Sequence, residues 1–169
     1  MKAFKILETK NFMSRFLMSD CFDDFLLAEA SITTYNTFVI DGHMIPDFYK
    51  NNESDADSLQ IPYAFSTWKD MRGICFELIK GKRTPVSFRF TLHFKPELVE
   101  HLLSQSEAAL SSKNLAAFVL NVKYQDGVVY LVTATSYQSF IADKTLDILW
   151  DNYFHAFLAA KEISFDETI

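Results

Sequence analysis

The stretch from Leu115 to Phe140, LAAFVLNVKYQDGVVYLVTATSYQSF, decides the fold of this chain. Two runs rich in β-branched and aromatic residues flank Asp126-Gly127, and runs of this composition are typical of β-strands. Asp-Gly favours a tight hairpin turn, because glycine adopts a positive φ at little steric cost. The stretch therefore predicts two antiparallel strands, over 115–124 and 128–140.

The segments on either side of this hairpin predict a strand and two helices. Upstream, TPVSFRFTLHF (84–94) places large apolar residues at alternate positions, which indicates a strand with one buried face. Pro96 then opens a helix, since proline is favoured in a first helical turn. Downstream, apolar residues at helical spacing predict a helix over 144–161, followed by a frayed tail over 164–169.

The N-terminal part of the chain predicts a similar succession of elements. We expect a strand over 2–7, a helix capped by Thr9, and a strand region over 25–41 that forms one long strand or two joined by a kink. Residues 42–62 lack periodicity and predict a mobile loop. An amphipathic stripe after Ser66, its expected N-cap, then predicts a helix.

Two octapeptides of the chain are nearly the same, TYNTFVID (34–41) and SYQSFIAD (136–143). Tyrosine, phenylalanine and aspartate recur at matching positions in both. We infer a structural duplication with halves over about 1–81 and 85–161, in which the second copy holds a hairpin where the first holds a single long strand. Chance similarity between short β-rich segments is the alternative.

The aromatic residues of these octapeptides are candidates for a binding face. In both, a tyrosine and a phenylalanine stand three residues apart, so in a regular strand they point to opposite faces of the sheet. One would be buried beneath helices and the other exposed to a partner sheet or a ligand, whereas a core role for both is the alternative. Tyr35 and Tyr137 are therefore weak binding candidates.

These elements predict a single α+β domain over 1–169, with an antiparallel sheet of about six strands and about four helices on one face. Cys21 and Cys75 lack any partner spacing, so we expect free buried thiols in a reducing compartment. The start, MKAFKILETK, does not resemble a signal peptide, and no run approaches the roughly 18 apolar residues of a membrane helix. We expect a cytoplasmic protein without a membrane association.

The charge of the chain bears on its partners. A net charge of −6 and a pI near 5.1 argue against non-specific binding of nucleic acid, which needs a basic surface. The one basic concentration is the run from Lys80 to Arg83, which also contains Lys82, with Lys69, Arg72 and Arg89 nearby. It is suited to gripping a phosphate or an acidic partner. The alternative is a solvated helix end whose cations offset the helix dipole.

The sequence nominates no catalytic machinery and no cofactor. It has no nucleophile elbow, phosphate-binding loop or dinucleotide fingerprint. The cluster Asp20, Asp23 and Asp24 offers hard oxygen ligands for a divalent cation, although a solvated capping turn is the alternative. His93 and His101 fall in a strand and the helix after it, so they are placed to approach each other, but they lack a third ligand. We expect no metal site.

Four segments together resemble a known family: MKAFKILETKNFMSRFL, ITTYNTFVIDG, CFELIKGKRTPVSFRF and WDNYFHAFL. They are similar to an uncharacterised family of small bacterial proteins from Firmicutes, a domain of unknown function, and the likeness spans nearly the whole chain. The resemblance implies a bacterial cytosolic protein. It carries no activity and no catalytic residues.

The hairpin segment VLNVKYQDGVVYLVTATSYQSF also resembles the hairpin of a DNA sliding-clamp domain. This second resemblance implies a clamp-like plan. The chain, however, is too short for two or three full clamp domains, and its helices share no basic face.

The function expected from the sequence is a non-enzymatic binding or scaffold module. It would bind a protein partner or associate with itself, through sheet edges or an exposed aromatic face. The alternative is a clamp-like accessory protein that binds nucleic acid through Lys69, Arg72, Lys80, Lys82 and Arg83. A small enzyme with a pocket between the halves is a third class, but the sequence offers no candidate acid–base pair for it.

Overall fold

The predicted hairpin is confirmed in a computed structural model, which describes residues 1–50, 61–107 and 113–168. Strands β6 (Leu115–Gln125) and β7 (Val128–Tyr137) pair antiparallel. Between them, Asp126 and Gly127 have φ angles of 53° and 80°, as a tight hairpin turn requires. This hairpin occupies the centre of the sheet.

All the strands described belong to one antiparallel sheet of eight strands, so the α+β class is confirmed and the sheet is larger than the six strands expected. Strand β4 lies off the main path and pairs with β2. In spatial order the main path contains β3 (Thr37–Asp41), β2 (Phe25–Thr33), β5 (Ser87–Phe94), β6, β7, β1 (Ala3–Ile6) and β8 (Phe165–Thr168), and β4 covers Ser66–Thr67.

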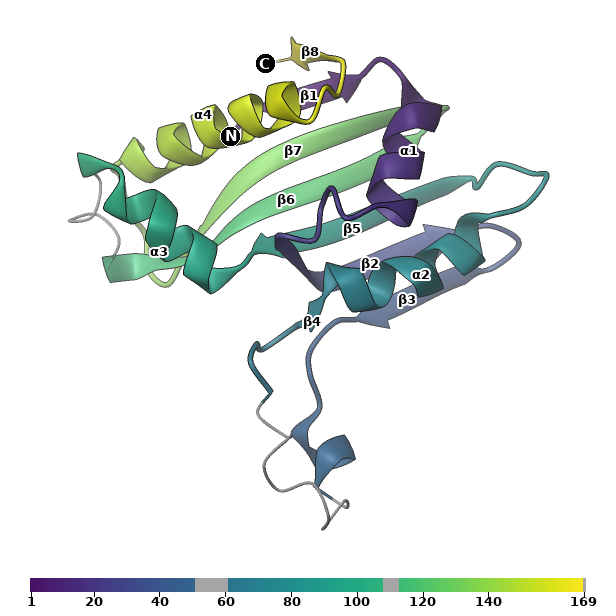
Figure 1. The fold of residues 1–169 in the computed structure, drawn as a ribbon, viewed down its shortest axis with the longest axis horizontal. Coiled ribbons are helices and arrows are strands. Elements are labelled where there is room, and N and C mark those ends of the chain that lie inside the picture. The colour runs from purple at the N-terminus through teal and green to yellow at the C-terminus, as the bar shows by residue number, and fades with distance from the viewer. Residues whose placement is uncertain (51–60, 108–112, 169) are drawn as a thin grey trace.

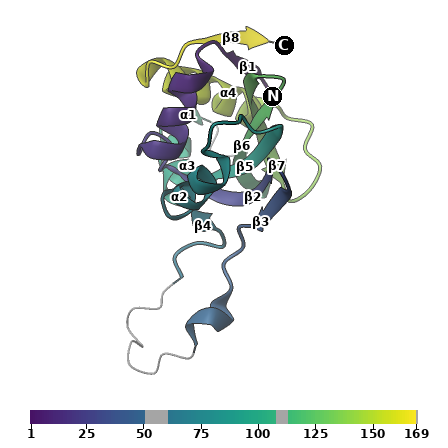
Figure 2. The same cartoon turned by 90° about the vertical axis from the view of Figure 1, so that its right-hand side faces the viewer.

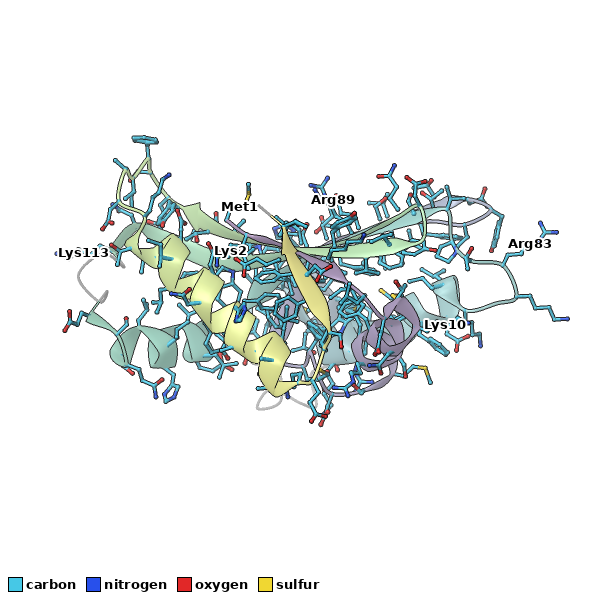
Figure 3. The ribbon with its side chains drawn as sticks, turned by 90° about the horizontal axis from the view of Figure 1, so that it is seen from above. Met1, Lys2, Lys10, Arg83, Arg89 and Lys113 are labelled. Carbon is cyan, nitrogen blue, oxygen red and sulfur yellow. The ribbon has the colours of Figure 1, made fainter. Side chains whose placement is uncertain are left out.

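The helices form a second layer on one face of this sheet (Figures 1 and 3). Helix α4 packs over β7, α2 over β2, and α1 against α2. The 3₁₀ helix η1, between β3 and β4, projects away from both layers (Figure 2). The α-helices are α1 (Thr9–Met18), α2 (Trp68–Ile79), α3 (Pro96–Ser104) and α4 (Thr145–Ala160), and η1 covers Pro46–Tyr49.

Alternation along the strands separates a buried face from an open face. In β5, Phe88, Phe90 and Leu92 are buried beneath the helices, whereas Arg89 is exposed on the opposite side (Figure 3). Within the described part of the chain, no helix has the length and apolar character that crossing a bilayer requires.

Two tryptophans anchor the helix layer on the sheet. Trp68 of α2 stacks on Phe16 at 4.4 Å between ring centroids, and its indole N–H donates to the Phe16 carbonyl oxygen at 2.9 Å. Trp150 of α4 stacks on Phe118 at 5.0 Å and donates to the carbonyl oxygen of Val119 at 2.9 Å. Both side chains are fully buried, and because each indole N–H has a partner, neither burial leaves a donor unpaired.

The predicted helix starts are off by one residue. Thr9 is the first residue of α1, and Glu8 precedes it without a side-chain capping bond. Ser66 lies in β4, and Thr67 caps α2 by accepting a hydrogen bond at 3.2 Å from the backbone N–H of Asp70.

The C-terminal tail is ordered rather than frayed over its described residues, because β8 pairs with β1 along its whole length. The predicted loop 42–62 contains η1 and an isolated bridge between His43 and Phe65, which closes its base. Residues 51–60 of that predicted loop lie outside the described residues.

The predicted duplication describes the order of elements but not their places in the sheet. Each half runs strand, helix, hairpin, helix, and the first half holds a hairpin, β2–β3, where a single long strand was expected. Strand β1 pairs with β7 and β8, whereas its expected counterpart β5 pairs with β2 and β6. The strands that would correspond in two equivalent lobes therefore have different neighbours in the sheet, and the pairing does not confirm the duplication.

The two octapeptides accordingly adopt different conformations. Residues 34–36 form the turn of the β2–β3 hairpin, and residues 37–41 form β3. In the second octapeptide Tyr137 ends β7, and residues 138–143 connect that strand to α4. Tyr35 and Phe140 are both highly exposed, at 86% and 95%, so a core role for both aromatic residues of each octapeptide is also wrong.

Candidate functional site

The connection between α2 and β5 carries most of the basic concentration found in the sequence. We call residues 80–85 the basic loop; it contains Lys80, Lys82 and Arg83. Lys80 is the C-cap residue of α2 and donates its N–H to the Phe76 carbonyl oxygen at 2.8 Å, and Gly81 follows as the predicted stop. Gly81 has a φ of 147°, a conformation that residues with a side chain rarely adopt, so the sharp exit from the helix depends on glycine.

A groove of about 340 Å³ runs between α1 and the basic loop. Its floor includes Phe88 of β5 and Tyr124 of β6, whose rings stack at 5.0 Å. Its lining also includes the hydroxyl-bearing residues Thr9, Ser14 and Thr84. We call it the apolar groove, because most of its surface is contributed by Met13, Leu17, Met18, Phe76, Ile79, Pro85, Phe88 and Tyr124.

Three cations border the apolar groove, and none of its lining residues is acidic. Lys80 forms an ion pair with Glu77 at 2.6 Å and lies over the Phe76 ring. Lys10 and Arg83 have no ion-pair partner among the described residues. Figure 3 places Lys10 on the helix side of the sheet and Arg83 at the end of the molecule. The rim therefore has a net positive charge that favours an anion.

A second hollow, of about 420 Å³, lies on the other side of the basic loop, and we call it the Tyr35 hollow. Tyr35 packs edge-on against Phe38 at 5.8 Å, and its exposed ring faces the same hollow as Lys82 and Arg83. The hydroxyl oxygen of Thr34, which also lines this hollow, is buried without a hydrogen-bond partner among the described residues. The basic loop thus separates two hollows that share Lys80 and Arg83.

The structure brings four of the seven predicted binding residues together: Tyr35, Lys80, Lys82 and Arg83. Arg72 instead forms an ion pair with Asp23 at 3.1 Å, and both side chains are less than a quarter exposed. This pair ties α2 to the segment before β2 and leaves Arg72 poorly placed for a ligand. Lys69 lies at the opposite end of α2 from Lys80, roughly 16 Å away at the rise of an α-helix.

Tyr137 lies in a partly buried position where its hydroxyl group links two elements of the fold. Its hydroxyl donates to Asp147 of α4 at 3.2 Å, which links the end of β7 to the first turn of α4. Burial and the neighbouring Asp147 carboxylate raise the pKa of Tyr137 to about 12. Tyr137 is therefore separate from Tyr35 in both place and surroundings.

The acidic and histidine clusters do not assemble a metal site, and the described residues contain no group of three metal-binding side chains. Asp23 is engaged by Arg72. His93 lies against Phe65 and near His43, and its pKa is lowered by burial and by that neighbouring histidine. His101 instead interacts with Gln105 of its own helix, so His93 and His101 do not form the pair that the sequence allowed.

The chemistry of the apolar groove is set by its lining residues. Hydroxyl groups and cations line it, but none of its lining residues carries a carboxylate, an imidazole or a thiol that would serve as a general base or a nucleophile. Cys75 is fully buried, and burial raises the pKa of its thiol to about 12. Burial also raises the pKa of Cys21. Neither thiol has the character of a reactive nucleophile.

Sequence reasoning missed the groove itself. Lys10, Met13 and Met18 come from α1, and Phe76 comes from α2. Helical periodicity assigns the apolar residues among them to the core. The signal in the sequence is an apolar stripe that is too broad to be covered by a single neighbouring element. The contact between α1 and α2, which leaves part of both stripes uncovered, is a tertiary feature.

Residues 15–166 match the model of a family described as "Family of unknown function (DUF5721)". No curated protein and no solved structure matches this chain. The matched residues include the whole of the basic loop, α2 and the Tyr35 hollow, together with the last turn of α1.

Proposed function

Since this chain belongs to DUF5721, a family of unknown function, its activity has to be argued from its own residues, and we propose that it is a non-enzymatic binding module whose ligand carries an anionic group. The ligand binds beside the basic loop, with the anion near Lys10, Lys80 and Arg83. The observation that carries the proposal is the apolar groove with its basic rim.

The charge distribution supports this placement. The chain has a net charge of −6, yet Lys10, Lys80, Lys82 and Arg83 gather around the two hollows, which no acidic residue lines. An apolar wall next to these cations lowers the local dielectric, and a charge-assisted contact is stronger there than in open water. The unpartnered hydroxyl of Thr34 adds a hydrogen-bond donor that an anion in the Tyr35 hollow would satisfy.

The proposal is tested with 1-anilinonaphthalene-8-sulfonate, a probe that joins an aromatic body to a sulfonate and fluoresces in apolar surroundings. We expect one equivalent to bind the native protein and the affinity to fall with added salt. The double variant Lys10→Ala/Arg83→Ala should bind about tenfold more weakly, because it removes two charged contacts.

The matched control for this experiment is Lys69→Ala, which removes an exposed helix cation far from the groove and should leave the affinity unchanged. Near-ultraviolet circular dichroism checks that each variant keeps its tertiary packing. Equal affinity in the native protein and the double variant would overturn the proposal.

Self-association, expected from the sequence, remains a second proposal. Strand β3 lies at the edge of the sheet, and its Val39 side chain is 66% exposed. An edge strand of this kind is open to pairing with another strand. The molar mass from light scattering should show a dimer that Val39→Lys reduces to a monomer, and a monomeric native protein would contradict it.

We also propose a bacterial cytoplasmic location, supported by Cys21 and Cys75, which are both free and buried. The clamp-like nucleic-acid alternative loses Arg72 to its ion pair with Asp23, and no feature of the described residues favours it. Salt-sensitive binding of an oligonucleotide that Lys69→Ala weakens would favour that alternative over ours.

A further inference from the structure

We propose that the apolar groove holds an unbranched acyl chain, with its terminal carboxylate among Lys10, Lys80 and Arg83. This inference rests on the proposed function, because it names the class of ligand that the same site takes. The ligand is a free carboxylate of medium chain length rather than a lipid in a bilayer.

The lining of the groove favours a flexible alkyl chain over a rigid polar ligand. Met13 and Met18 of α1 line it together with Phe76 and Ile79 of α2, and methionine side chains adapt to irregular apolar shapes. The interior offers few polar atoms, so a ligand with many hydrogen-bonding groups would leave them unpaired there. The volume of about 340 Å³ lies at the lower end of the range for small-molecule sites.

The rim favours a carboxylate at one end of that chain. Lys10 comes from α1 and Arg83 from the basic loop, so the two cations approach the groove from different elements. Neither has an ion-pair partner among the described residues. A guanidinium group is suited to a planar carboxylate, which it binds through two parallel hydrogen bonds. An apolar chain with one anionic end therefore complements both parts of the site.

Isothermal titration of a chain-length series tests the inference directly. The probes are hexanoate, octanoate, decanoate and dodecanoate, each kept below its micellar concentration. Each methylene group buried in the groove should tighten binding by about fourfold, until the groove is filled and the affinity levels off. Decylamine should bind more weakly than decanoate, because its head group is repelled by the rim.

Reversing the charge of two rim residues gives a result that a misfolded variant would not produce. In Lys10→Glu/Arg83→Glu the order should reverse, with decylamine bound more tightly than decanoate. Both substituted residues are polar at the groove rim, so this change spares the core. A second variant, Met13→Asp, should remove the dependence on chain length, whereas Ile74→Asp, on an exposed face of α2 away from the groove, should retain it.

The outcomes separate this inference from the proposed function. Binding of the anilinonaphthalene probe with carboxylate affinities that do not depend on chain length would overturn the acyl chain and leave the anion site standing. Failure of both the probe and the carboxylates to bind would overturn both. Sedimentation with phosphatidylglycerol vesicles, without binding of any monomeric carboxylate, would also overturn the acyl-carboxylate inference.

Discussion

The two ends of the helix layer use the same anchor but close in different ways. At one end Trp150 of α4 stacks on a phenylalanine and bonds a backbone carbonyl, and at the other end Trp68 of α2 does the same. Helix α4 buries six side chains against the sheet, whereas α2 buries only Trp68 and Cys75. The remaining apolar residues of α2 are partly covered, and some of them form a wall of the apolar groove.

Polar contacts reinforce the closed end. The buried Asp151 of α4 accepts hydrogen bonds from the Thr133 hydroxyl and from the Met1 ammonium group, which fixes α4 to β7 and to the start of β1. No comparable tie joins the second half of α2 to α1 within the described residues. We call these regions the closed end (α4) and the open end (α1, α2 and the basic loop), and the apolar groove, our proposed binding site, lies where the second layer is incomplete.

The largest expected effect comes from removing each tryptophan anchor. Trp150→Ala should lower the free energy of unfolding by about 5 kcal/mol and Trp68→Ala by about 3 kcal/mol, because α2, which buries fewer side chains than α4, can shift to fill the space of the lost ring. Trp→Phe at each position keeps most of the packing and serves as the control. Denaturant titrations measure the free energy of unfolding of each variant, provided that its slope against denaturant concentration is unchanged. A larger loss for Trp68→Ala than for Trp150→Ala would contradict the comparison.

A glycine between β3 and β4 gives the next effect. A Cβ at Gly42 would overlap the Leu27 carbonyl oxygen, which belongs to the backbone of the neighbouring strand and cannot rotate away. Gly42→Ala should therefore cost about 3 kcal/mol, since overpacking forces the backbone to shift. Thermal unfolding checks it, and a loss under about 0.5 kcal/mol, the range of an ordinary surface change, would contradict the strand contact.

Gly73 provides the opposite case within α2 of the open end. Apart from its chain neighbours and the backbone of its own helix, no atom lies within 4 Å of the place where its Cβ would be, and its helical backbone suits alanine. Gly73→Ala should raise the free energy of unfolding by about 1 kcal/mol, because alanine has the higher helix propensity. The same denaturant titration measures it, and destabilisation would mean that α2 packs more tightly than described.

The smallest effect concerns the closed end at high pH. The pKa of Tyr137 is raised to about 12 in the folded protein, above the value near 10 of an unfolded tyrosine. Its neutral phenol therefore contributes stability that is fully present below about pH 10 and is lost as the pH rises to about 12. Tyr137→Phe should reduce the decline in the free energy of unfolding as the pH rises through this range. An unchanged decline would mean that the Tyr137 hydroxyl does not stabilise the closed end.

Much of the fold follows from local sequence patterns, for identifiable reasons. The turn at Asp126-Gly127 and the periodicity of α4 each depend on a few neighbouring residues, so the sequence predicts them well. Strand β8 was missed because its polar residues are ordered only by pairing with β1. The different neighbours of β1 and β5 could not be predicted for the same reason, since strand order is set by long-range pairing.

The residues around the candidate site fall into the same two groups, those that are close in the sequence and those that only the fold brings together. The basic loop is contiguous in sequence, so the sequence alone groups Lys80, Lys82 and Arg83. Arg72 was grouped with them because its partner, Asp23, is distant along the chain. The contribution of Lys10 required knowing that α1 and α2 pack side by side.

The measurement that tests the central claim most directly is amide chemical-shift mapping by NMR during a titration with decanoate. The account predicts that the shifted signals come from the open end, namely α1, the second half of α2 and the basic loop, while those of α4 and β8 stay in place. Shifts concentrated on α4 and β8, or spread evenly over the sheet, would contradict it.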